Sequence, residues 1–187
     1  MTEEKVMVTG GAGFFGSVLV KKLLDKGHSV VSFDLNQINF QHPRLTSIQG
    51  DIRNLSDVSS ACDGIDVVHH NVAQVPIAKD KDLFDSVNLG GARILSEACL
   101  SQGVTTLVYT SSSAVFGIPK KNPVTIDIIP CPAEAYGKAK FDAEVIFSQL
   151  VDKGINVSIV RPRTILGTGR LGIFQILFEW IYQGKNI

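Results

Sequence analysis

The chain has 187 residues, of which 44% are hydrophobic, and its 18 basic residues balance 18 acidic ones. This length suits one well-buried domain, and the composition is that of an ordinary globular protein. Because the charges balance, no global field would attract nucleic acid or an anionic membrane, and neither partner is predicted.

Targeting and redox signals point to an intracellular protein. Residues 1–5 are mostly polar and charged, and no signal-peptide pattern follows them. The longest apolar run near the C-terminus is far shorter than the ~20 residues of a membrane span. Cys62, Cys99 and Cys131 lie far apart without metal-ligand spacing, which indicates reduced thiols and no metal site. A cytoplasmic enzyme is therefore expected.

Strand and helix patterns alternate along the chain. After a first strand that leads into Gly10, the pattern predicts a helix over 14–26 and strands over 29–33 and 45–49. Next come a short helix capped by Asn54, a strand over 66–69, a helix over 84–102 and a strand over 104–109. A loop over 111–131, a helix from Pro132 to about residue 153 and a strand over 156–160 follow. This alternation predicts an α/β fold with a doubly wound, Rossmann-like parallel sheet.

The segment 6–16 contains a strand, a glycine-dense turn and the start of a helix. Its glycines Gly10, Gly13 and Gly16 let the backbone approach a pyrophosphate, whose charge suits a helix N-terminus. Asp34 follows 18 residues after Gly16, at the end of the next strand. Its carboxylate can accept hydrogen bonds from a ribose hydroxyl and would repel a 2′-phosphate, which favours NAD over NADP. A solvated aspartate at a strand end is the alternative.

Tyr136 and Lys140 are spaced to share one face of a helix. A free tyrosine has a pKa near ~10, and a neighbouring ammonium lowers that value toward the range in which tyrosine can act as a base. The serine run 111–113 follows the fifth strand directly, where a hydroxyl can bond a substrate alcohol. Each signal alone fits a helix-surface pair or a loop. The glycine turn, the acid, the serines and the Tyr136–Lys140 pair together, in this order along alternating strands and helices, are a strong signal.

These residues resemble the extended short-chain dehydrogenases/reductases, in particular the NAD-dependent epimerase/dehydratase family that acts on nucleotide sugars. The resemblance covers essentially the whole chain. The matching segments are 9–16, Asp34, 50–52, 67–70, 88–91, 111–117, 136–140 and 161–162.

The resemblance implies a catalytic role for Ser112, an acid/base role for Tyr136, and a role for Lys140 in binding the nicotinamide ribose and lowering the pKa of the tyrosine. It also implies that Asp51 and Ile52 line the adenine site and that 162–165 lie near the carboxamide. The implied cofactor-binding residues are Gly10, Gly13, Phe14, Phe15, Gly16, Asp34, Asp51, Ile52, Ala73, Gln74, Asn88, Tyr136, Lys140 and Pro162.

The sequence departs from the family pattern at three places. Val72 stands where a small alanine is frequent, and is expected to narrow one wall of the cofactor site. Phe116 replaces a frequent tyrosine, which should be harmless. The run 112–114 lacks the Thr-Asp-Glu of sugar dehydratases, which argues against dehydration.

The segment 171–183 is apolar on nearly all sides, which predicts a buried helix. Because members of the resembled family continue into a last strand and a substrate domain, the chain is expected to be a fragment. Residues 1–170 would form the NAD-binding domain with the catalytic residues, and 171–187 would lead toward a missing C-terminal substrate domain. The alternative is a complete protein that buries this helix in an oligomer.

Three functions remain open at the sequence level. The first is an NAD-dependent epimerase that oxidises a nucleotide-sugar hydroxyl transiently to a ketone. The second is a hydroxysteroid-dehydrogenase-like or other alcohol oxidoreductase, and the third is a dinucleotide-binding sensor or scaffold without turnover. The resemblance also suggests a homodimer through the helices that contain 87–98 and 136–151.

Overall fold

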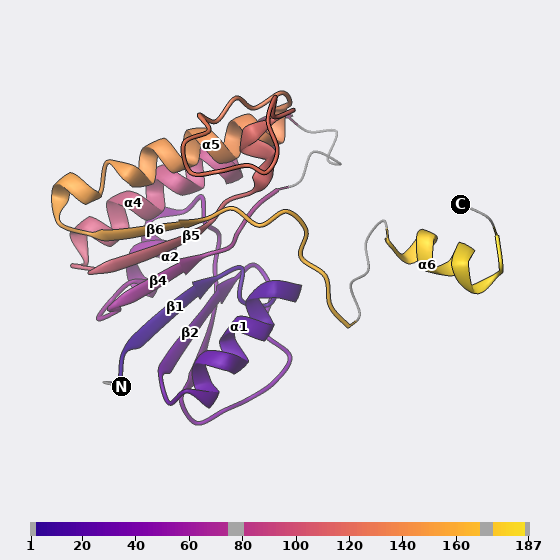
Figure 1. Ribbon diagram of the computed structural model, residues 1–187. Helices are drawn as coiled ribbons and strands as arrows, with labels where there is room; N and C mark the ends of the chain where they lie inside the picture. Colours follow the sequence, from indigo (N-terminus) through magenta and orange to yellow (C-terminus); the bar gives the residue numbers. More distant parts are fainter. Residues whose placement is uncertain (1–2, 75–80, 169–173, 186–187) are drawn as a thin grey trace.

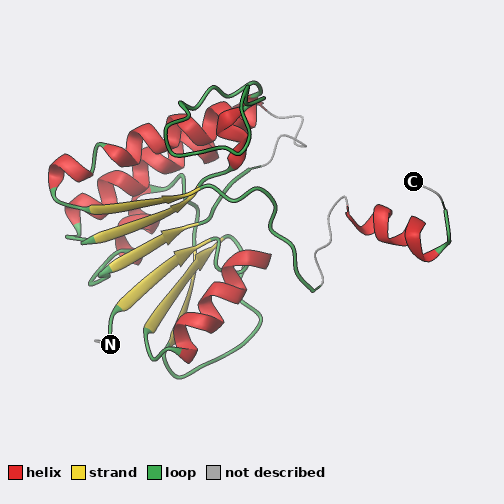
Figure 2. Cartoon of the chain, viewed as in Figure 1, coloured by secondary structure: helices red, strands yellow, loops and turns green. Residues whose placement is uncertain are grey.

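The computed structural model describes residues 3–74, 81–168 and 174–185. A six-stranded parallel sheet in the order β3-β2-β1-β4-β5-β6 forms its centre (Figures 1 and 2). The strands are β1 (Lys5–Thr9), β2 (Ser29–Asp34), β3 (Leu45–Gln49), β4 (Val67–His70), β5 (Thr106–Thr110) and β6 (Asn156–Val160). The predicted α/β fold with a doubly wound parallel sheet is confirmed.

Helices cover both faces of the sheet (Figure 1). On one face, Val6 and Val8 of β1 pack with Val20 and Leu24 of α1 (Phe14–Asp25). On the other face, a larger cluster that includes Met7 lies under α2 (Leu55–Ala61), α4 (Gly91–Ser101) and α5 (Ala135–Ser148). Neighbouring residues of β1 therefore point to opposite faces, as the two-residue repeat of a strand requires.

The strand order places the carboxyl ends of β1 and β4 side by side at the middle of the sheet. From β1 the chain proceeds to β2 and β3 on one side, and then returns to β4 on the other. Ligands of open parallel sheets bind beyond such a reversal, at the carboxyl ends of the strands. The fold thus fixes where a binding site can form.

The long helix predicted over 84–102 is divided in the structure. It consists of α3 (Lys81–Asp85), a π-helical turn η1 (Ser86–Gly90) and α4. At Gly91 an added Cβ would lie 3.0 Å from the side chain of Ile52, so the glycine permits a close approach between α4 and the segment after β3. π-helical turns inside α-helices occur frequently at functional sites.

The predicted start of the helix from Pro132 to about residue 153 is wrong. Pro132 does not lie inside α5, which begins at Ala135 after the N-cap residue Glu134. The carboxylate of Glu134 accepts hydrogen bonds from the N–H groups of Tyr136 (3.2 Å) and Gly137 (3.0 Å). This side chain satisfies two of the N–H groups that a helix start leaves without a partner, so the helix begins after Glu134 and not at the proline. A short 3₁₀ turn, η3 (Val151–Lys153), follows the end of α5.

Burial of the last apolar helix is also not observed. Helix α6 (Phe174–Tyr182) contains no buried residue, and it lies away from the sheet in Figure 1. The side chains of Ile176, Phe178, Trp180 and Ile181 remain 44–57% exposed. They lack a packing surface within the part of the chain that the structure describes. Residues 171–173 of the predicted helix lie outside the described residues.

Candidate active site

A cavity of about 700 Å³ opens beyond the carboxyl ends of the strands. It runs from the glycine turn before α1 to the start of α5. All but one of the site residues predicted from the sequence line this cavity: Gly10, Gly13, Phe14, Phe15, Gly16, Asp34, Asp51, Ile52, Ala73, Gln74, Ser112, Tyr136, Lys140 and Pro162. Segments far apart in the sequence therefore meet around one space.

The glycine turn is shaped by the absence of side chains. Gly10 has a φ of +69°, which favours glycine. A Cβ on Gly16 would overlap the carbonyl oxygen of Gly10 and lie 2.8 Å from its carbonyl carbon. Gly13 is the N-cap residue of α1 and has no side chain to cover the helix N–H groups. The turn thus presents backbone and a helix N-terminus to the cavity, the arrangement that suits a pyrophosphate.

Asp34 at the end of β2 is held against this turn. One carboxylate oxygen accepts a hydrogen bond from the N–H of Ala12 (3.2 Å), and the other accepts one from Asn36 (3.0 Å). Both bonds fix the carboxylate at the wall of the cavity. A ribose hydroxyl placed there would meet a pre-oriented acceptor.

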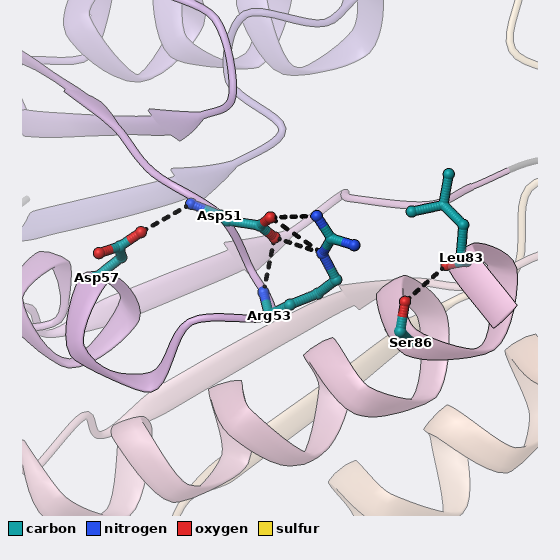
Figure 3. Close-up of polar contacts among 5 residues, drawn as sticks. All are labelled: Asp51, Arg53, Asp57, Leu83 and Ser86. Atoms are coloured by element: carbon teal, nitrogen blue, oxygen red, sulfur yellow. Dashed lines mark hydrogen bonds and ion pairs between the residues drawn. The ribbon is translucent and has the colours of Figure 1, made fainter.

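Asp51 forms a charged cluster at the same end of the cavity (Figure 3). The guanidinium of Arg53 donates to both Asp51 oxygens, with Nε 2.9 and 3.0 Å from them. These hydrogen bonds lower the pKa of Asp51, although burial opposes the effect. The N–H of Asp51 donates to Asp57 (3.1 Å). Sequence reasoning missed Arg53, although its position two residues after Asp51 made it a candidate partner.

Asn88 is the predicted residue that does not line the cavity. It is buried on η1 and bonds both backbone groups of Gln74: Oδ1 accepts from the N–H, and Nδ2 donates to the C=O, each at 3.1 Å. Gln74 itself lines the cavity, as do Val72 and Ala73. Asn88 therefore acts on the cavity wall indirectly, by fixing the backbone after β4.

Lys140 lies deep in the wall opposite the glycine turn, with 3% of its surface exposed. Its ammonium donates to the carbonyl of Thr110 (2.8 Å) and lies 5.9 Å from the centre of the Tyr136 ring. Burial lowers the pKa of Lys140 to about 8, and attraction to Glu144 partly offsets this fall. An ammonium thus lies close to a tyrosine ring at the cavity wall.

Ser112 follows β5 at the start of a short 3₁₀ turn, η2 (Ser113–Phe116). Its hydroxyl oxygen accepts a hydrogen bond from the N–H of Ala114 (3.1 Å), so the hydroxyl hydrogen remains available for another acceptor. The N–H of Ser113 donates to the carbonyl of Pro162 (2.9 Å). This bond joins the serine loop to the segment after β6, and both segments line the cavity.

Behind these residues lies an ion pair between the buried Glu144 and the partly exposed Arg161, which the sequence analysis did not predict. Glu144 of α5 pairs with Arg161 through two hydrogen bonds of 2.9 and 2.7 Å, and accepts another from Ser111. The guanidinium of Arg161 lies 5.1 Å from the centre of the Phe116 ring. A signal for Glu144 was present, because Tyr136, Lys140 and Glu144 follow one another at four-residue intervals along one helix face.

A second polar group lies at the carboxyl ends of the two central strands, β1 and β4. Nδ1 of the buried His70 is 2.7 Å from the hydroxyl oxygen of Thr9, and its ring stacks on Tyr109 at 5.6 Å. Burial lowers the pKa of His70 to about 3, and the nearby charge of Lys140 acts in the same direction. His70 is therefore neutral at physiological pH.

Other kinds of site find little support in the described residues. They contain no group of three or more histidine, cysteine or carboxylate side chains arranged to hold a metal ion. Cys62, Cys99 and Cys131 are free thiols, and the first two are buried. Among the described helices, none has both the length and the apolar character that a bilayer crossing requires.

Comparison with known proteins decides the family. Residues 6–185 match the model of the NAD dependent epimerase/dehydratase family. The chain belongs to this family. The sequence-based resemblance to this family of short-chain dehydrogenases/reductases is confirmed, and NAD is the family's cofactor.

Curated proteins with similar sequences include one without a described activity and one named as a dehydrogenase. An uncharacterized protein, y4nG of Sinorhizobium fredii, is 52% identical over 97% of this chain and 46% of its own length. A 3 beta-hydroxysteroid dehydrogenase/Delta 5→4-isomerase of Mycobacterium tuberculosis H37Rv is 34% identical over 96% of this chain and 52% of its length. The chain thus spans about half the length of these curated relatives.

Among solved structures, the UDP-glucuronic acid 4-epimerase of Bacillus cereus in complex with NAD is similar to this chain. It shares 29% identity with a TM-score of 0.83, covering 97% of this chain and 64% of the epimerase. The names of these similar proteins therefore describe different activities, while the family model and the epimerase structure both name NAD.

Proposed function

We propose that this chain binds NAD in the cavity and uses Tyr136, Lys140 and Ser112 to oxidise a secondary alcohol to a ketone. One observation carries the proposal: the buried ammonium of Lys140 lies 5.9 Å from the Tyr136 ring, in the wall of the cavity that the glycine turn closes at its other end. Cofactor binding and proton transfer can then occur in one space.

The cavity residues fit the cofactor part by part. The tight glycine turn, which leaves no room for a Cβ at Gly16, suits a pyrophosphate, and the oriented carboxylate of Asp34 suits ribose hydroxyls. Asp51 and Ile52 would border the adenine. Ala73, Gln74 and Pro162 would border the nicotinamide half, with Asn88 holding the Gln74 backbone. When bound, NAD supplies the hydride acceptor.

The reaction needs a base for the substrate hydroxyl. Tyr136 would remove this proton as phenolate, and the nearby Lys140 ammonium would stabilise the phenolate by charge attraction. Ser112 would donate a hydrogen bond to the substrate oxygen, since its own oxygen already accepts one from the N–H of Ala114. The run 112–114 supplies no acid for elimination, so dehydration is not proposed.

The leading substrate class is a nucleotide sugar, with epimerisation as the outcome. Similarity to the UDP-glucuronic acid 4-epimerase supports this, at 29% identity over 97% of the chain. In an epimerase the ketone is reduced again from its other face, so NAD is recycled.

Net alcohol oxidation is the second candidate. The 34% identity with the mycobacterial hydroxysteroid dehydrogenase favours it. The same residues would act, but the ketone would leave and NADH would accumulate.

The remaining proposals concern the domain boundaries, the oligomeric state and the cellular location. We place an NAD-binding domain with the catalytic residues in 1–170 and treat 171–187 as the start of a separate segment. The exposed apolar side chains of α6 support this division. A homodimer through α4 and α5, a cytoplasmic location and the alternative of a non-catalytic sensor remain predictions from the sequence.

Tyr136→Phe tests the proposal. The expected result is loss of turnover by about 100-fold or more, because the base is absent, while the protein still binds NAD. Turnover is measured on the complete natural polypeptide that contains these 187 residues. Sugar nucleotides and hydroxysteroids are the substrates, and both NADH and epimers are read.

NAD affinity is measured by calorimetry on the same protein. Epimer formation without NADH supports the first candidate, and NADH formation supports the second. NAD binding combined with turnover that survives in Tyr136→Phe would contradict the proposed catalysis. NAD binding with no turnover of any tested substrate would favour the sensor.

A further inference from the structure

The carboxylate of Glu144 is buried beneath the candidate site, with 3% of its side chain exposed. Its two oxygens pair with Nε and a terminal nitrogen of Arg161 at 2.9 and 2.7 Å, and one of them accepts a hydrogen bond from Ser111. A buried charge is expensive unless it is paired and hydrogen-bonded, and this one is both. Neither the family assignment nor the proposed chemistry gives this carboxylate a task.

Glu144 lies one helical turn after Lys140 on the same face of α5. Both side chains are buried, so water screens their attraction only weakly. Burial lowers the pKa of Lys140, and attraction to Glu144 raises it, with a net value of about 8. The two effects therefore compete at the ammonium that faces Tyr136.

Apart from the proposed base Tyr136, the other groups around Lys140 supply no negative charge at neutral pH. His70, from β4, is neutral because its pKa is about 3. Tyr109, from β5, is protonated because burial raises the pKa of its phenol. Tyr136 approaches from the preceding turn of α5, and Arg161, after β6, is positively charged. Among these described neighbours, Glu144 is the anion.

We propose that Glu144 is a positioning residue that holds the buried ammonium of Lys140 in its charged form. The inference deepens the proposed function and rests on it, because a charged Lys140 is what would stabilise a Tyr136 phenolate and bond the cofactor. Arg161 opposes Glu144 electrostatically while fixing its carboxylate in place. Glu144 should therefore raise the pKa of Lys140, and Arg161 should lower it.

The test uses Glu144→Gln and Arg161→Gln in the full chain. Nuclear magnetic resonance follows the ¹³Cε shift of labelled lysine against pH, and the Lys140→Arg variant identifies the Lys140 signal by its disappearance. In Glu144→Gln the titration midpoint should fall by about one pH unit, because the anion is lost and the Arg161 cation remains. In Arg161→Gln the midpoint should rise, because Glu144 then acts unopposed.

Asp142→Asn is the matched control. It removes the same charge from the same helix, but two residues from Lys140, on a different face of α5. The Lys140 midpoint should not move in this variant. NAD affinity is measured on each protein between pH 6 and 10. The alkaline loss of affinity should begin about one pH unit lower in Glu144→Gln than in the parent chain.

Opposite shifts in the two variants support the inference. Shifts in the same direction, or no shift in either variant, would overturn it, because a purely structural ion pair has no reason to act with opposite sign. If Glu144→Gln does not fold, a rise in Arg161→Gln supports the inference, and its absence overturns it. If Lys140 titrates as expected but the parent chain does not bind NAD, the proposed function fails and the electrostatic inference stands.

Discussion

The two ends of the cavity are built in different ways. At the glycine turn, the shape comes from backbone and from side chains that are missing: Gly10 has a positive φ, and Gly16 sits against its carbonyl. At the opposite end, two buried charged side chains are held by hydrogen bonds: Lys140 donates to the backbone carbonyl of Thr110, and Glu144 pairs with the partly exposed Arg161. Close backbone packing therefore shapes one end of the cavity, the steric end, and interactions between charged groups shape the other, the electrostatic end.

This difference predicts different responses to change. A steric site should fail when a single methyl group is added, and the failure should not depend on pH. An electrostatic site should tolerate some changes of shape, but its stability should vary with pH wherever a buried group would gain or lose a proton. Each prediction below tests one side of this contrast, and they are ordered from the largest expected effect to the smallest.

Gly16→Ala should have the largest effect. The added Cβ would overlap the Gly10 carbonyl oxygen and lie 2.9 Å from the Cα of Gly11, and both neighbours are backbone that cannot rotate away. Overpacking of this kind costs about 3 kcal/mol or more, so we expect strong destabilisation at every pH. Urea unfolding at pH 6, 7 and 8 measures the free energy of unfolding.

Gly13→Ala is the matched control for this change. Gly13 has an ordinary φ of −70°, and the nearest atom to an added Cβ is the Gly10 oxygen at 3.2 Å. We expect this variant to fold with a loss of about 1 kcal/mol, because the neighbour needs to shift only slightly. Equal losses in the two variants would show that the turn is not sterically closed at Gly16.

His70 tests the electrostatic end. Its pKa in the folded chain is about 3, against an ordinary value of 6.5, so between these values the unfolded chain binds more protons. Stability contributed by neutral His70 is therefore complete above pH 6.5 and is lost as pH falls toward 3. Between pH 7 and pH 5 the expected loss is about 2 kcal/mol.

His70→Gln removes the titration while keeping a polar side chain near Thr9. We expect this variant to be less stable than the parent chain at pH 7, because stacking on Tyr109 is lost. Its stability should fall less between pH 7 and pH 5. His69 and Asp51 also titrate with lowered pKa values, but they are present in both proteins and cancel in the difference. Parallel pH profiles would mean that His70 accepts a proton in the folded state without cost.

Local patterns allowed the steric end to be predicted from the sequence, together with the sheet. Gly10, Gly13, Gly16 and Asp34 follow two adjacent strands at fixed distances, so spacing along the chain specifies their place in space. The parallel sheet followed from the alternation of strands and helices. The strands over 45–49 and 156–160 were predicted with their observed bounds.

The electrostatic end could not be predicted in the same way. The contacts of Glu144 with Ser111 and Arg161 join residues 33 and 17 positions apart, and that of Thr9 with His70 joins residues 61 apart. No local spacing encodes such pairs, because they depend on which strands become neighbours. The π-helical turn at Asn88 was missed for a related reason, since its side chain bonds the backbone of Gln74 across the fold.

Asn88→Ala has the smallest expected effect. It tests a polar side chain whose hydrogen bonds fix a backbone segment of the cavity wall. The variant leaves the N–H and C=O of Gln74 without their present partners. Because Gln74 is only half-buried, water can replace part of these bonds, and we expect a loss of about 1 kcal/mol that does not change between pH 5 and 8. NAD affinity should fall with it, since Gln74 lines the cavity.

Ser86→Ala on the same π-helical turn separates these two effects. Its hydroxyl donates to the carbonyl of Leu83 (3.0 Å), a bond within the helical segment in Figure 3. A comparable loss of stability is expected, but with NAD affinity unchanged, because no backbone bond of the 71–74 segment is broken. Calorimetric titration with NAD and urea unfolding on both variants make the comparison. If Asn88→Ala bound NAD as tightly as Ser86→Ala, the position of Gln74 would not depend on Asn88, and the cavity wall after β4 would be held by the sheet alone.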